Sequence, residues 1–181
     1  MDPFAPLVRA LKSARVRFVV IGVAGADYYA RSAGLLFTTQ DWDLFLPPDA
    51  LNLLRAWRAC ENAGLDLWVG DEPLERPLDR QLAEQVVSRR ALVRCQNREL
   101  QVDLALVMEG FEFEQVWRQR RVFRVGRVGI PVARLAHIVA SKAAAGRPKD
   151  VLFLAAHEEV LRTLLHQAPS SGGRRTRKPR G

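Results

Sequence analysis

The stretch FVVIGVAGADYYARSAGLLFTTQDWDLFL, residues 18–46, decides the fold predicted for this chain. Residues 18–21 are a short β-branched apolar run typical of a buried strand, and Gly22 follows where the backbone must turn sharply. Residues 23–32 have the length of about three helical turns. After a loop, residues 41–46 return to the pattern of a strand, which opens with two acids. The stretch therefore predicts strand, glycine turn, helix and second strand.

The second strand places two carboxylates on the same face. Its period of two puts Asp41 and Asp43 on one side with Phe45, while Trp42 and Leu44 point to the other side. The Cα atoms of the two acids are roughly 6.5 to 7 Å apart. The charges therefore repel, and each carboxylate raises the pKa of the other unless a cation lies between them. Because Mg²⁺ takes oxygen ligands, usually one or two carboxylates with substrate phosphates, we expect Mg²⁺ or Mn²⁺ there.

The glycine turn predicts a phosphate site beside this metal. Gly22 precedes the helix, and the backbone N–H groups of a helix N-terminus bind phosphate oxygens. Neighbouring metal and phosphate sites are the arrangement used in phosphoryl transfer.

These residues resemble the nucleotidyltransferase superfamily, whose pattern is a strand, a Gly-Gly or Gly-Ser turn, a helix and Asp-x-Asp. Residues 38–44, TTQDWDL, are similar to the motif of the minimal and AbiEii-like bacterial branch. Residues 130–150 look like that branch's later signature, a helix with Lys142 followed by Arg-x-Lys-Asp at 147–150. With Asp103, the resemblance extends over about residues 16–165.

The resemblance implies an α+β (α/β) fold, with a mixed twisted sheet flanked by helices and a short C-terminal helical pair. It implies a metal-dependent nucleotidyltransferase that moves a nucleoside monophosphate from an NTP to an acceptor hydroxyl. The acceptor would be RNA, protein or a small molecule, and the enzyme would be the toxin of a toxin–antitoxin pair with an antitoxin protein as its partner. The implied catalytic residues and metal ligands are Asp41, Asp43 and Asp103, and the implied nucleotide-binding residues are Gly22, Thr39, Lys142 and Arg147.

Asp103 is expected beside the other two acids. In residues 100–107 the apolar side chains alternate onto one face, so Asp103 lies on the opposite face. An acid near the middle of a strand is costly to bury alone. If this strand pairs with residues 41–46, Asp103 reaches the same metals as ligand and base.

Two residues near the C-terminus carry further predictions. Lys142 continues the apolar stripe of Leu135, Ile138 and Val139, so it either extends to solvent or reaches into a pocket. Asp150 is either a first-turn acid favoured by the helix dipole or a functional group.

Three segments are expected: a nucleotidyltransferase-like domain at 1–132, C-terminal helices at 133–167 and a disordered basic tail at 168–181. Five of the eight net positive charges lie in the last eight residues, so the folded part is only modestly basic, as suits a phosphate-bearing substrate. Cys60 and Cys95 lack zinc-ligand spacing, and no apolar run approaches the ~20 residues that span a bilayer. We expect a cytoplasmic protein without a membrane partner.

The remaining elements follow from periodicity and turn residues. Helices are expected at 4–14, 50–63, 78–89, from 135 to Gly146 and from Pro148 to about Leu165; strands are expected at 65–69, 91–95, 100–107, 121–125 and 128–132, with a loop at 71–77.

Alternative functions remain open from the sequence. Val23 stands where the superfamily usually has Gly or Ser, and Phe37 where the branch often has Arg, which favours a catalytically impaired binding or regulatory module. A dinucleotide-binding oxidoreductase fits poorly, since its glycine fingerprint would need glycines where the chain has Ala24 and Asp27. A glycosyltransferase also uses Asp-x-Asp, but the chain is short for that fold.

Overall fold

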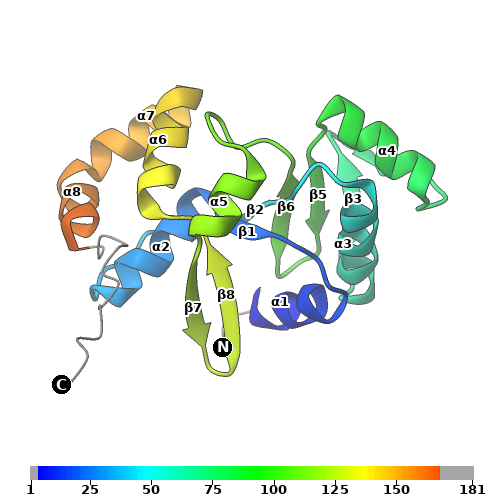
Figure 1. Cartoon of the computed structure of the whole chain (residues 1–181), viewed down its shortest axis with the longest axis horizontal. Coiled ribbons are helices and arrows are strands. Elements are labelled where there is room, and N and C mark those ends of the chain that lie inside the picture. The colour runs from blue at the N-terminus through cyan, green and yellow to red at the C-terminus, as the bar shows by residue number, and fades with distance from the viewer. Residues whose placement is uncertain (1–3, 168–181) are drawn as a thin grey trace, which may run out of the picture.

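The computed structural model describes residues 4–167, which form one eight-stranded sheet with helices around it (Figure 1). The strand order is β4-β3-β5-β6-β2-β1-β8-β7. The strands are β1 Val19–Ile21, β2 Asp41–Phe45, β3 Asp66–Val69, β4 Glu72–Pro73, β5 Val93–Gln96, β6 Gln101–Ala105, β7 Arg121–Val125 and β8 Val128–Val132. The helices are α1 Phe4–Ser13, α2 Gly22–Ser32, α3 Ala50–Asn62, α4 Arg80–Arg89, α5 Phe113–Gln119, α6 Leu135–Ala145, α7 Pro148–Ala156 and α8 Glu158–Gln167. This architecture confirms the predicted α+β class with a mixed sheet flanked by helices.

The sheet is mixed because two of its strand pairs are parallel. β2 pairs with β6 in parallel, and β1 pairs with β8 in parallel, whereas the hairpins β5–β6 and β7–β8 are antiparallel. β1 and β2 are also antiparallel although α2 separates them along the chain. The centre of the sheet is therefore assembled from segments far apart in sequence.

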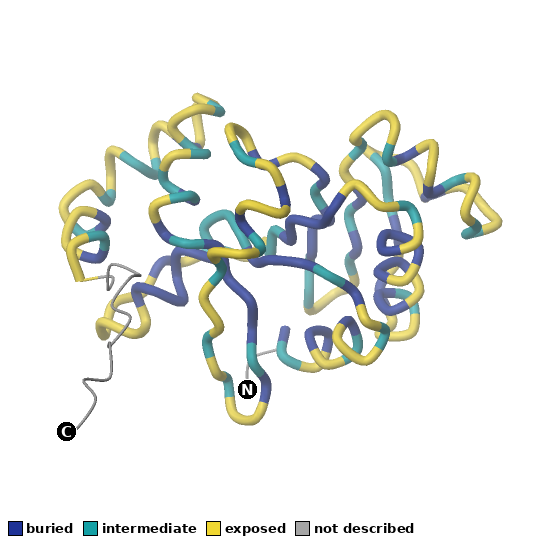
Figure 2. The backbone as a smooth tube through the Cα atoms, in the orientation of Figure 1, coloured by how far each residue is buried: buried dark blue, intermediate teal, exposed yellow. Residues whose placement is uncertain are grey.

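Burial does not alternate along the central strands, because both faces of the sheet are covered; Leu44 and Phe45 of β2 are both buried although they point to opposite faces. The strand β1 lies in the dark blue interior, and exposed backbone concentrates on the outer turns of the helices (Figure 2). On the apolar face of β2, Trp42 stacks on Phe4 of α1 with ring centroids 4.1 Å apart. On the other face, Phe45 meets Phe113 of α5 edge to face at 5.4 Å. The acid-bearing face of β2 is thus partly covered by α5.

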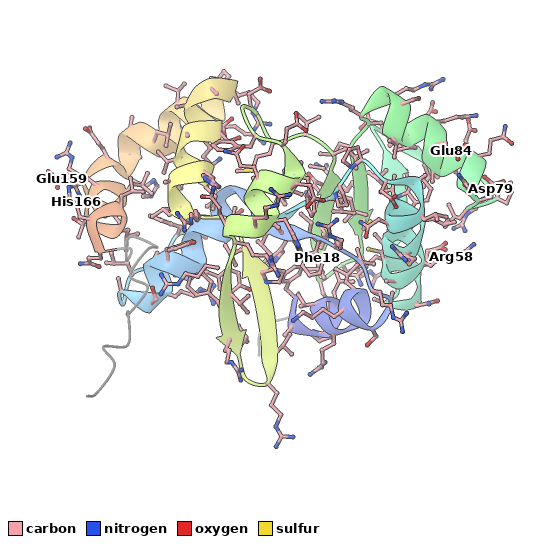
Figure 3. The ribbon with its side chains drawn as sticks, viewed as in Figure 1. Phe18, Arg58, Asp79, Glu84, Glu159 and His166 are labelled. Atoms are coloured by element: carbon pink, nitrogen blue, oxygen red, sulfur yellow. The ribbon has the colours of Figure 1, made fainter. Side chains whose placement is uncertain are left out.

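Capping residues set the start of two helices. Asp49 accepts a hydrogen bond from the backbone N–H of Asn52 at 2.6 Å and begins α3, as predicted. Asp79 does the same for Leu82 at 2.9 Å, and its side chain lies at the start of α4 (Figure 3). The helix predicted at 78–89 consequently begins two residues later.

Two local expectations were wrong or incomplete, and one helix was not predicted. The final predicted helix is two helices, because the chain leaves helical geometry at His157 (φ −119°). Glu158 and Glu159 begin α8, where the helix dipole favours acidic side chains. The predicted loop at 71–77 contains the two-residue edge strand β4, paired with β3. The helix α5 is not among the elements predicted from the sequence.

The C-terminal helices form one group beside α2, to the left in Figure 1, where α6 packs on α2 and α7 and α8 pack on α6. The predicted basic tail at 168–181 lies outside the described residues. Within residues 4–167, every helix is too short or too polar to cross a bilayer.

Candidate active site

Three charged side chains form a row across neighbouring strands. Asp43 of β2 lies directly opposite Asp103 of the parallel strand β6, and Asp103 lies directly opposite Arg94 of the antiparallel strand β5. Residues in direct register point to the same face of a sheet. The prediction that the strand of Asp103 pairs beside that of Asp41 and Asp43, with its acid on their face, is therefore confirmed.

Arg94 holds Asp103 by a two-pronged ion pair. Its Nε donates to Asp103 Oδ1 at 2.8 Å and its second guanidinium nitrogen donates to Oδ2 at 3.0 Å. Asp103 is 7% exposed, whereas 40% of the Arg94 side chain is accessible. The guanidinium fork matches both carboxylate oxygens and supplies a counter-charge to the buried acid.

Asp43 has the opposite environment. Within residues 4–167 no group donates a hydrogen bond to its carboxylate. Burial, followed by the charge of Asp103, raises the pKa of Asp43 to about 6, although Lys142 and Lys149 act in the opposite direction. A half-buried carboxylate that lacks a bonded cation is a favourable ligand for one.

Gly22 leaves the room that Asp43 occupies. Gly22 begins α2 with φ +67°, and a Cβ atom added to it would lie 2.1 Å from Oδ2 of Asp43. A side chain at this position would meet both the steric penalty of a positive φ and a direct clash. The predicted sharp turn at Gly22 is confirmed, and its carboxylate contact is an additional reason for glycine.

Asp41 lies at the open end of the same strand face. Gln101, directly opposite in β6, donates from Nε2 to Asp41 Oδ1 at 2.8 Å. The hydroxyl of Thr39 contacts the backbone N–H and C=O of Asp41, each at 3.3 Å. Thr39, predicted to bind nucleotide, therefore lies at the site and also supports the start of β2.

A second charged group faces the acids from α6 and α7. Asp150 is fully buried, and its two oxygens accept from Lys142 Nζ at 2.7 Å and from Arg147 Nε at 2.6 Å. Burial raises the pKa of Asp150, but these two hydrogen bonds outweigh it, so the pKa lies below its usual value. Asp150 thus holds both cations that the resemblance assigns to nucleotide binding.

The two charged groups line one cavity of about 300 Å³. Its walls contain every residue predicted for the site, namely Gly22, Thr39, Asp41, Asp43, Asp103, Lys142 and Arg147, together with Val23, Arg94, Lys149 and Asp150. A larger hollow of about 780 Å³ shares Thr39 and Asp41 with this cavity and continues past Trp42 and Gln101 toward Arg31 and Arg98.

Arg94 and Gln101 are the site residues that sequence reasoning missed. A β5–β6 turn at residues 96–99 would have placed Arg94 opposite Gln101. In the structure Gln96 pairs with Gln101, so the register moves and Arg94 meets Asp103. The alternation of residues 91–96 with 100–107 was the available signal, but the exact turn decides the partner.

The acids fit one divalent cation better than two. Within the described part of the chain, no three His, Cys, Asp or Glu side chains are grouped as a metal site. Arg94 is hydrogen-bonded to both oxygens of Asp103. Within residues 4–167, both oxygens of Asp43 and Oδ2 of Asp41 accept no hydrogen bond and are available as metal ligands. Two carboxylates facing a cavity, with phosphate or water as the remaining ligands, suit Mg²⁺ or Mn²⁺.

Comparisons with known proteins add evidence on the fold. No family model matches this chain, and no curated protein matches its sequence. A solved structure from Thermotoga maritima, described as a putative nucleotidyltransferase, superposes with a TM-score of 0.51 at 14% sequence identity, and the match covers 89% of each chain. The chain therefore has a nucleotidyltransferase-like fold, in which the acids and the cations line one cavity.

Proposed function

We propose that this chain is a nucleotidyltransferase that uses Mg²⁺ or Mn²⁺ to transfer a nucleoside monophosphate from an NTP to an acceptor hydroxyl. The observation that carries the proposal is the single cavity in which the Asp41–Asp43 pair and Asp103 face the Lys142–Arg147 group. The acids suit a metal-bound phosphate, and the cations suit the anionic remainder of the nucleotide. The likeness to the T. maritima structure supports the fold that this chemistry requires.

In the proposed reaction, Asp41 and Asp43 hold the cation, which would neutralise phosphate charge and polarise the bond that breaks. Lys142, Arg147 and Lys149 bind the β- and γ-phosphates. The acceptor oxygen forms a bond to the α-phosphorus, the bond from this phosphorus to the bridging oxygen breaks, and pyrophosphate leaves. Asp103, which Arg94 holds in place, would accept the acceptor proton on a carboxylate lone pair that the two hydrogen bonds from Arg94 do not use.

The direct test is label transfer from each α-³²P-labelled NTP, with Mg²⁺ or Mn²⁺, to RNA, protein and small polyol acceptors. We expect transfer with the native chain and its loss in Asp43→Asn. Asp66→Asn is the matched control, because Asp66 is an exposed acid on β3 outside the cavity. Equal transfer by Asp43→Asn and the native chain would contradict the proposal.

A catalytically impaired binding module is the second candidate. Val23 lines the cavity, and three of its cations, Arg94, Lys142 and Arg147, are already paired with acids. This candidate predicts NTP binding by calorimetry with no pyrophosphate release for any of the tested acceptors. Pyrophosphate release that requires Asp43 would exclude it.

We extend the proposal to a toxin-type role, which is supported by the resemblance of residues 38–44 and 130–150 to the AbiEii-like branch. Induced expression in a bacterial host should arrest growth, and Asp43→Asn should not. Co-expression of a small reading frame neighbouring the gene tests for an antitoxin. Growth that continues at matched expression of the native chain would contradict the toxin role.

A further inference from the structure

Arg94 donates hydrogen bonds to both carboxylate oxygens of Asp103, the oxygens that a second metal ion would need as ligands. From this geometry we infer that Arg94 takes the place of the second metal, so that the chain binds one divalent cation, at Asp41 and Asp43. The inference rests on the proposed function, because it specifies the metal content of that same site.

Arg94 cannot leave Asp103 without a cost. The two side chains are in direct register on β5 and β6, and both Asp103 oxygens are engaged. Asp103 is 7% exposed, so withdrawal of the guanidinium would leave a buried carboxylate uncompensated. Loss of one partner from such a pair is destabilising, because it leaves the buried charge of the other partner unpaired. A metal that used Asp103 would have to offset this cost.

Charge balance also favours one divalent ion. Asp41, Asp43 and Asp103 carry three negative charges and Arg94 carries one positive charge, so the group is doubly negative. One divalent cation neutralises it. Two-metal sites hold their ions about 3.5–4 Å apart, so a second ion bound to Asp103 would be forced close to a guanidinium that stays protonated.

The wall of the cavity that contains Lys142, Arg147 and Lys149 supplies the positive charge that a second ion would otherwise provide. Lys142 and Arg147 share only Asp150, and Lys149 adds a third cation to the same cavity. This wall therefore carries a net positive charge toward the phosphates. The cavity already contains the positive charges of Arg94 and of the Lys142–Arg147 group. A metal ion is therefore needed only at Asp43, whose negative charge has no bonded counter-charge.

The test counts bound Mn²⁺ ions by electron paramagnetic resonance, with Mn²⁺ alone added to the full chain. We expect about one ion per native chain and about two in Arg94→Met, with the spin coupling of a close ion pair. Arg89→Met is the matched control: it removes an exposed arginine at the end of α4 that lies outside the cavity, and the count should stay at about one. Thermal melts confirm that each variant is folded.

The double variant Arg94→Met/Asp103→Asn identifies the ligand of the added ion. Its count should return to about one, because the acid that Arg94 released is gone. Two ions in the native chain would overturn the inference and leave the proposed function standing. One ion in a folded Arg94→Met would also overturn it. No bound ion in the native chain would overturn the proposed function together with the inference.

Discussion

Asp43 and Asp103 lie directly across from each other on the parallel strands β2 and β6. Of these two acids, Asp103 is the one bonded to the Arg94 guanidinium. The two acids share a face and a cavity but differ in how their charge is balanced. Asp103 is paired with Arg94, whereas within residues 4–167 no cation is bonded to the Asp43 carboxylate.

Asp43→Asn should stabilise the chain in metal-free buffer at pH 8. The pKa of Asp43 is raised from 3.8 to about 6, so its ionised form destabilises the folded state, and stability falls as the pH rises through this range. After a discount for solvent screening, the gain should be about 1–2 kcal/mol in chemical denaturation at pH 8.

The gain should nearly disappear at pH 3.5, where the carboxyl is protonated in the folded state and mostly protonated in the unfolded state. The exposed control Asp66→Asn should stay within about 0.5 kcal/mol of the native chain at both pH values. A destabilised Asp43→Asn at pH 8 would show that the carboxylate has a stabilising partner.

Mn²⁺ affinity should fall as the pH is lowered through 6. Binding requires the ionised carboxylate, and the proton competes once the pH is below the Asp43 pKa of about 6. Between pH 7 and pH 5 the apparent affinity should drop about tenfold, measured by calorimetric titration. The same affinity at pH 5 and pH 7 would place the cation away from Asp43.

Gly22→Ala should unfold more easily than the native chain and lose Mn²⁺ binding. The added methyl group would lie 2.1 Å from Asp43 Oδ2, at a residue with φ +67°. Gly34→Ala is the matched control, because Gly34 has φ +76° but open space around its Cβ position. The control should lose only the conformational part, about 1–2 kcal/mol, and keep its metal. Equal losses of stability and equal metal binding in the two variants would remove the argument for a close contact.

Lys142→Met should lower the free energy of unfolding by about 1–3 kcal/mol, because it removes one of the two hydrogen-bonded cations of the buried Asp150 carboxylate and leaves Arg147 as its remaining partner. Lys149→Met is the control from the same cavity, since Lys149 is exposed and makes no ion pair within residues 4–167. It should leave stability within about 0.5 kcal/mol of the native value.

Nucleotide binding separates the two roles of these lysines. Calorimetric titration with an NTP should show weaker binding to Lys149→Met without a loss of fold. If Lys142→Met were as stable as the native chain, the Lys142 amine would not be needed to stabilise the fold. Its role would then be nucleotide binding alone.

The sequence by itself determined the local pattern of the site. Strand alternation placed Asp41 and Asp43 on one face and Asp103 opposite the apolar residues of its own strand. Gly22 predicted the turn, and the stripe that ends at Lys142 predicted a lysine directed inward. These features follow from periods of two and 3.6 residues, which operate over a few neighbours along the chain.

Only the tertiary structure decided which charges meet. The parallel pairing of β2 with β6, the register that puts Arg94 opposite Asp103, and the engagement of Lys142 and Arg147 by the buried Asp150 are all contacts between elements. Alternation tells which face a side chain occupies, but it does not tell which strand lies beside it or at what offset. That choice is made by the packing of the whole sheet against its helices, because a shift in register changes every cross-strand partner at once.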